Sequence, residues 1–213
     1  GYSVTAVDFG TNFATGATTF NLGASTVTLS GAGAIWNPTA ANFTVNAGTS
    51  TIHFTDTSGS AKTFAGGGKA YYNFKWTTGG AGAITITGSN TFNAWVHTGG
   101  TTKTITITAG TTQTFTAGSG ALNAIMQGGA ASNLITIQSS TTSAYTFSSS
   151  VAISTDYISL SYCTGAGAAL HYAGANSTNG GNNTNWSFTA APATFVGRRR
   201  GVERAMTRAM ASL

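Results

Sequence analysis

The chain has 213 residues, of which 41% are hydrophobic, 11% aromatic and only 6% charged, with a formal net charge of +5. Because an ordinary soluble domain carries about 25% charged residues, the surface of this protein is expected to be polar but largely uncharged. The apolar content excludes a disordered low-complexity chain, no apolar run approaches the roughly 18 residues of a membrane span, and the opening residues lack the features of a signal peptide.

Residues 1–19 are expected to form an N-terminal cap or attachment segment, followed by regular repeats over residues 20–164. In the repeats, β-branched or aromatic residues alternate with Thr, Ser or Asn, which is the period-two pattern of half-buried strands. The clearest examples are residues 26–30, 42–46, 51–55, 83–87 and 103–108. With 29 glycines and only 2 prolines, the turns between strands are expected to use Gly and Asn.

Equivalent strands recur at a spacing typical of repeat proteins. Ile84 and Ile105 are about 21 residues apart, Ile105 and Ile135 about 30, and Ile135 and Ile158 about 23. Gly-containing corners separate the strands, at residues 66–68, 79–80, 99–100, 118–120 and 128–129. Coils of this length with three short faces predict an all-β parallel β-helix (β-solenoid), in which each coil pairs with the next at about 4.8 Å.

An antiparallel β-sandwich is the alternative fold, because its strands have similar lengths and spacings. Sandwich hairpins favour Asn-Gly or Asp-Gly turns, and residues 179–180 are the one such pair, outside the regular repeats. The sequence therefore favours the solenoid.

The composition changes at residue 165. Residues 165–190 are too rich in Gly and Asn for regular coils and are interpreted as a C-terminal cap, in which Trp186 and Phe188 cover the open end of the core. Residues 191–213 are interpreted as a linker and a basic amphipathic tail. From Val202 onward, apolar residues recur at helical spacing, which predicts one short helix.

The tail holds five of the nine basic residues, and its apolar stripe needs a partner. We expect it to dock onto another protein rather than onto nucleic acid, because no aromatic residues are interleaved with the arginines. The candidate docking residues are Arg198, Arg199, Arg200, Val202, Arg204, Met206, Arg208, Met210 and Leu213.

Four segments resemble a family of repetitive β-helix proteins that occur in phage particles and on bacterial surfaces: residues 63–74, 84–93, 106–115 and 133–140. Residues 172–188 (YAGANSTNGGNNTNWSF) resemble that family's terminal motif, which usually has Gly where this chain has Asn185. The resemblance implies a β-helix carried on a virion or cell surface, and it implies no catalytic residues.

Catalysis, metal binding and cofactors are not expected. The carboxylates Asp8, Asp56, Asp156 and Glu203 lie in separate segments and form no evident acid–base pair. The three histidines, His53, His97 and His171, lack metal-ligand spacing and are expected to be solvated or hydrogen-bonded strand residues. Cys163 is the single cysteine and is interpreted as a small core residue.

Two binding hypotheses concern the solenoid surface. Tyr72, Trp76 and Trp95 either pack in the core and corners or form a glycan-stacking strip. Outward Thr rows, such as residues 85/87 and 104/106/108, resemble ice-binding arrays, but Lys103 and Trp76 are expected to interrupt them.

These patterns favour a structural protein of a bacteriophage virion, of the decoration, head-fibre or tail-fibre type, which is not an enzyme. We expect it on the virion surface, bound to capsid or tail proteins, with a homotrimer as one oligomeric form. A glycan-binding module of a bacterial surface protein or adhesin is the alternative, and a lyase of the β-helix type ranks third.

Overall fold

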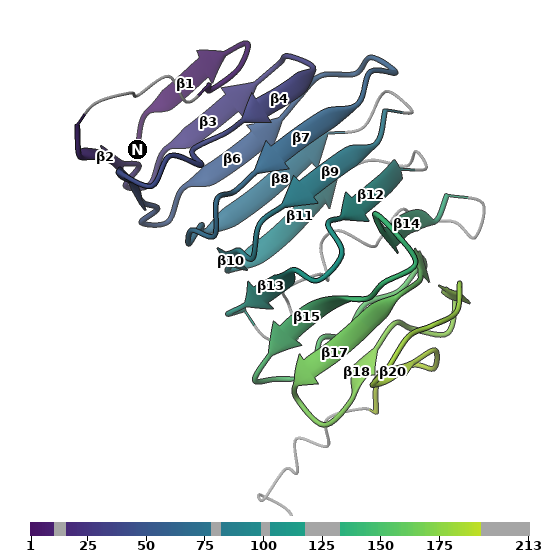
Figure 1. Cartoon of the computed structure of the whole chain (residues 1–213). Helices are drawn as coiled ribbons and strands as arrows, with labels where there is room; N and C mark the ends of the chain where they lie inside the picture. Colours follow the sequence, from purple (N-terminus) through teal and green to yellow (C-terminus); the bar gives the residue numbers. More distant parts are fainter. Residues whose placement is uncertain (11–15, 78–81, 99–102, 118–132, 193–213) are drawn as a thin grey trace, which may run out of the picture.

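The structure is a computed structural model that describes residues 1–10, 16–77, 82–98, 103–117 and 133–192. Within these ranges the chain is all-β and contains no helix. The strands stack coil upon coil from the N-terminal end to the C-terminal end (Figure 1). Outside the stretch that includes residues 118–132, the described strands and bridges recur on three faces in the same order, and we name these the first, second and third face.

The first face is a five-stranded sheet of β1 (Ser3–Ala6), β3 (Thr26–Leu29), β6 (Thr51–Phe54), β8 (Asn73–Thr77) and β11 (Ala94–Thr98). The second face is a seven-stranded sheet of β4 (Gly33–Trp36), β7 (Lys62–Ala65), β9 (Ile84–Thr87), β12 (Lys103–Ile107), β14 (Ile135–Ser139), β16 (Ile158–Leu160) and β19 (Thr178–Asn179).

The third face contains a pair, β2 (Thr18–Asn21) and β5 (Phe43–Asn46), and a four-stranded sheet of β10 (Thr91–Phe92), β13 (Thr112–Phe115), β15 (Tyr145–Ser149) and β17 (Cys163–Gly167). The last two strands, β18 (His171–Tyr172) and β20 (Trp186–Ser187), pair with each other. Each of them comes after a third-face segment in the chain, which is also where the first-face strands of earlier coils come.

Each of these strand pairings is parallel and joins strands from successive coils. The predicted parallel β-solenoid is therefore confirmed. The alternative β-sandwich is wrong, because it requires antiparallel neighbours joined by short hairpins.

The register agrees with the expected spacing at two of the three steps that were predicted. Ile84 lies opposite Ile105, and Ile135 lies opposite Ile158. Between β12 and β14 the spacing was wrong, because Ile105 lies opposite Ile137 and Lys103 opposite Ile135. The chain that connects these coils includes residues 118–132, outside the described ranges, and a spacing rule cannot fix the register across a connection of variable length. The shift is two residues, so the same side of each strand still faces the core.

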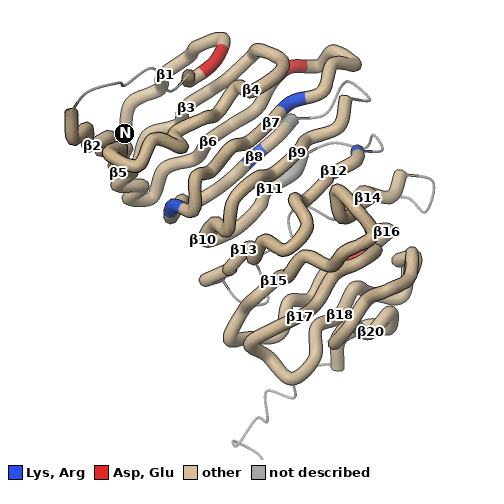
Figure 2. The backbone as a smooth tube through the Cα atoms, viewed as in Figure 1, with Lys and Arg blue, Asp and Glu red and all other residues tan. Residues whose placement is uncertain are grey.

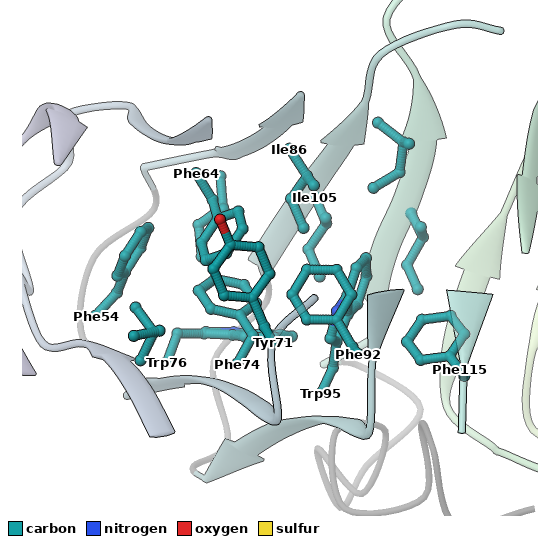
Figure 3. Packing of buried hydrophobic residues seen from close by; sticks show 14 of the residues in the cluster. Phe54, Phe64, Tyr71, Phe74, Trp76, Ile86, Phe92, Trp95, Ile105 and Phe115 are labelled. Atoms are coloured by element: carbon teal, nitrogen blue, oxygen red, sulfur yellow. The ribbon is translucent and has the colours of Figure 1, made fainter. Parts of the chain in front are cut away.

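Large apolar side chains stack in columns inside the solenoid (Figure 3). On the first face, Ile52, Phe74 and Trp95 are successive partners in one column. Phe64, from the second face, lies 4.9 Å from Phe74 between ring centroids, and Phe92, from the third, lies 5.6 Å from Trp95. Aromatic residues from three faces thus close the interior in its middle coils, where each buried side chain contributes roughly 1.5–3 kcal/mol to folding.

Amide side chains stack at several corners. Asn90 is buried, and its Nδ2 donates to Oε1 of Gln113 in the next coil at 3.1 Å. Asn46 donates to Asn21 at 2.7 Å, and Asn93 to Asn73 at 3.1 Å. An amide side chain both donates and accepts hydrogen bonds, so stacked amides can satisfy one another's hydrogen-bonding groups without a charged residue.

The two ends of the solenoid extend further than expected. In the segment taken as an N-terminal cap, β1 is already paired with β3, and Phe9 is bridged to Trp36. In the segment taken as too irregular for coils, β19 pairs with β16, Thr184 is bridged to Thr164, and β20 pairs with β18. Trp186 and Phe188 pack against the core, as expected of a cap.

Asn185 explains how a Gly- and Asn-rich segment completes a coil. Its φ is 59°, in the left-handed region that favours Gly and tolerates Asn. The Asn185 side chain also donates to the carbonyl oxygen of Gly165 at 3.1 Å, a bond that Gly could not make.

Gly165 permits the close approach of the last coil. A Cβ at this position would lie 2.4 Å from Cδ2 of His171 and 2.9 Å from the backbone oxygen of Asn185. We expect Gly165→Ala to lower the free energy of unfolding by about 2–3 kcal/mol, since a ring and a backbone must move. Urea denaturation measures this, with Gly59→Ala as the control, because a Cβ at Gly59 meets nothing within 4 Å. Equal stability of the two variants would contradict the packing described.

Candidate functional site

The predicted docking segment cannot be placed. Residues 193–213 lie outside the described residues, and with them all nine candidate docking residues and the predicted helix. The basic tail therefore stays a prediction from the sequence.

The predicted glycan-stacking strip is wrong for two of its three residues. Trp76 and Trp95 are 1% and 0% exposed, and their ring centroids lie 6.4 Å apart inside the solenoid. Trp76 shares the inward side of β8 with Phe74, and Trp95 lies opposite Phe74 in the neighbouring strand β11. Tyr72 precedes β8 at a corner and is partly exposed, so it alone of the three remains accessible to a ligand.

The outward Thr rows are aligned between coils. On the second face Thr63, Thr85 and Thr106 are successive partners, and Gln138 ends the row. On the third face the row consists of Thr112, Thr146, Thr164 and Thr184. Lys103 and Trp76, expected to interrupt such rows, point into the core instead. These faces offer hydroxyl donors and acceptors without charge, which suits binding but supplies no acid or base.

Acidic and basic residues are sparse along the described chain (Figure 2). Asp8, Asp56 and Asp156 lie in different coils. Asp156 accepts hydrogen bonds from the backbone of Tyr157 and Asn176 and from the Asn176 side chain, at 2.6–3.0 Å. This carboxylate fixes the corner before β16.

A buried ion pair was missed by the sequence analysis. Nζ of Lys62 lies 2.8 Å from Oδ2 of Asp56, and the two side chains are 1% and 15% exposed. The ammonium also donates to the backbone oxygens of Ser60 at 2.7 Å and Ser58 at 3.4 Å. Hydrogen bonds from Lys62 and Ser58 hold the pKa of Asp56 well below its usual range, so this carboxylate stays ionised and cannot act as an acid near neutral pH.

Lys103 is a second buried lysine, 2% exposed, at the start of β12. Burial lowers its pKa, and the charge of Lys62 lowers it further, while that of Asp56 raises it. Period-two alternation could have predicted that both lysines are buried, because Lys62 shares a side of its strand with Phe64, and Lys103 shares one with Ile105 and Ile107.

The histidines do not come together. His53 is partly buried on β6, and burial and the charge of Lys75 lower its pKa. His171 is fully buried at the start of β18, and the side chain of His97 is outside the described set. Among the described residues, no group of three His, Cys, Asp or Glu side chains could hold a metal ion.

Cys163 lies in the core, as predicted. Its side chain is fully buried, and burial raises the pKa of the thiol to about 12. A thiol in this state is neither a nucleophile nor a metal ligand near neutral pH.

The observed architecture defines the class: a three-faced parallel β-solenoid with uncharged hydroxyl rows outside and aromatic columns inside. Among the described residues, no helix has the length and apolar character to cross a membrane. Comparison of the chain with models of protein families, with curated proteins and with solved structures found no match.

Proposed function

We propose that the protein is a structural component of a bacteriophage virion, of the decoration, head-fibre or tail-fibre type. The observation that carries the proposal is the stack of parallel coils with few charged residues. Such a stack is stiff, because backbone hydrogen bonds join successive coils, and on the second face they do so without a break from β4 to β19.

The chemistry of the described residues favours a passive role. Two of the three described carboxylates, Asp56 and Asp156, are engaged in fixing corners, and Cys163 is a buried thiol. We therefore propose no catalytic activity, cofactor or metal. The proposed location is the virion surface, and the proposed partners are capsid or tail proteins, with homotrimer formation as a further proposal.

The basic tail is the proposed attachment to the particle. We expect a chain that lacks residues 197–213 to be absent from purified virions, while the full chain is present, as measured by mass spectrometry of the particles. Circular dichroism of the truncated chain should still show the strand content of the full chain. A second variant, with Arg198, Arg199 and Arg200 replaced by Lys, tests whether positive charge is sufficient. Incorporation of the truncated chain at the level of the full chain would refute tail docking.

A glycan-binding module of a bacterial surface protein is the second candidate, and the partly exposed Tyr72 is the observation that favours it. A glycan array would support this candidate if binding is present in the full chain and lost in Tyr72→Ala. Trp76 and Trp95 have no part in it, because they are buried.

A further inference from the structure

His171 joins three segments of the last coils. Its imidazole Nδ1 accepts a hydrogen bond from the backbone N–H of Ile153 at 2.9 Å, and Nε2 lies 3.1 Å from the carbonyl oxygen of Ala166. Its own backbone N–H donates to the carbonyl oxygen of Asn185 at 3.0 Å. One residue thus connects the chain before β16, the strand β17 and the chain that leads into β20.

These partners fix the neutral form of the ring. A carbonyl oxygen only accepts, so Nε2 carries the hydrogen and donates to Ala166, and Nδ1 must remain without a proton to accept from Ile153. A second proton, on Nδ1, would point at the N–H of Ile153, so that two donors would face each other. The ring is also fully buried, so the added charge would have no contact with water.

No described carboxylate stabilises a charged His171. Burial lowers its pKa and the hydrogen bond to Ala166 raises it, without a contribution from any charged side chain. Of the titratable groups on the surrounding elements, Cys163 and Tyr145 have raised pKa values and stay neutral, and Tyr172 is the adjacent residue in β18. The carboxylate of Asp156 is held by Tyr157 and Asn176.

We infer that His171 makes the C-terminal end of the solenoid sensitive to acid: its protonation opens residues 171–187 while the earlier coils stay folded. The effect is local because protonation breaks the hydrogen bond from Ile153, and the other partners of the ring, Ala166 and Trp186, also lie in the last coils. In the middle coils, His53 lies on the outward side of β6, between two buried neighbours. The inference is independent of the proposed function.

The direction follows from linkage. An unfolded or opened segment binds a proton at the ordinary His pKa of 6.5, whereas the folded segment binds it only at lower pH. The stability contributed by neutral His171 is therefore complete above pH 6.5 and is lost as the pH falls through the folded pKa. For one proton, the opening constant rises by up to about tenfold per pH unit in this interval.

Hydrogen–deuterium exchange of the full chain, read by mass spectrometry and corrected for the intrinsic effect of pH, tests this. Between pH 6.5 and 5.0 we expect peptides from residues 171–187 to lose protection, by at most about 15-fold for one proton, and peptides from β9 and β12, which contain no histidine, to keep theirs. His171→Asn retains an acceptor for the N–H of Ile153 but does not titrate. In this variant, residues 171–187 should therefore keep their protection between pH 6.5 and 5.0. His53→Asn, the matched control, should behave like the wild type.

Loss of protection that persists in His171→Asn, that is spread evenly over all coils, or that is absent from the wild type would overturn the inference. If His171→Asn does not fold, the wild type decides alone. A local loss that levels off at the folded imidazole pKa of His171, measured by NMR, supports the inference, and a loss that continues below that pKa refutes the role of His171.

Discussion

Trp95→Ala is expected to lower the free energy of unfolding by about 3–5 kcal/mol. The Trp95 ring is fully buried, and its centroid lies 5.3–6.2 Å from those of Phe74 on the first face and of Phe92, Phe115 and Phe147 on the third. Its removal leaves a cavity lined by rings from two faces, and these rings cannot move to fill it because their strands are held in register by parallel pairing.

Urea denaturation followed by circular dichroism measures this loss, and Tyr72→Ala is the matched control. Tyr72 is an aromatic residue two positions before Phe74 but partly exposed, so its replacement should cost about 1 kcal/mol or less. If Tyr72→Ala destabilised the protein as much as Trp95→Ala, or if Trp95→Ala had no effect, the assignment of inward and outward sides would be wrong.

Asp56→Asn is expected to lower the free energy of unfolding by about 2–3 kcal/mol near neutral pH, because it leaves the ammonium of Lys62 buried without a counter-ion. The estimate is below that for a fully buried pair, since the carboxylate retains some contact with water. Asp56→Asn combined with Lys62→Met removes the uncompensated charge, so the double variant should recover most of the lost stability.

The pH dependence of this pair has a definite sign. The pKa of Asp56 is lowered in the folded protein, so its contribution is complete above the unfolded value of 3.8 and is lost as the pH falls below it. The difference in unfolding free energy between wild type and Asp56→Asn should therefore be constant from pH 5 to 7 and shrink below about pH 4. A difference that grows in acid, or a double variant less stable than Asp56→Asn, would contradict the ion pair.

The fold could be predicted because two independent patterns agree. Alternation of apolar residues with Thr indicates strands, and the recurrence of Ile84 at Ile105, and of Ile135 at Ile158, indicates stacked coils. Both patterns are local or nearly so. The register between β12 and β14 depends on a connection that includes residues 118–132, and no local pattern determines it.

The candidate site was less predictable, for physical reasons that differ between residues. Alternation shows that Phe74 and Trp76 share one side of their strand. A row of aromatic residues is compatible with both a core and a ligand-binding strip, and only the complete solenoid shows that this side faces the core. Lys62 and Lys103 occupy inward positions that alternation alone would assign to apolar residues, and the buried lysine at position 62 is compensated by Asp56, six residues earlier. His171 depends on partners from three segments that no sequence pattern brings together.

The measurement that tests the solenoid most directly is a set of backbone nuclear Overhauser effects on the isotopically labelled chain. We predict amide contacts of Thr106 in β12 with residues near Thr85 in β9 on one side and near Gln138 in β14 on the other. Close Hα–Hα contacts between β12 and a strand adjacent to it in the sequence, such as β11 or β13, would instead show antiparallel hairpins and contradict the stacked coils.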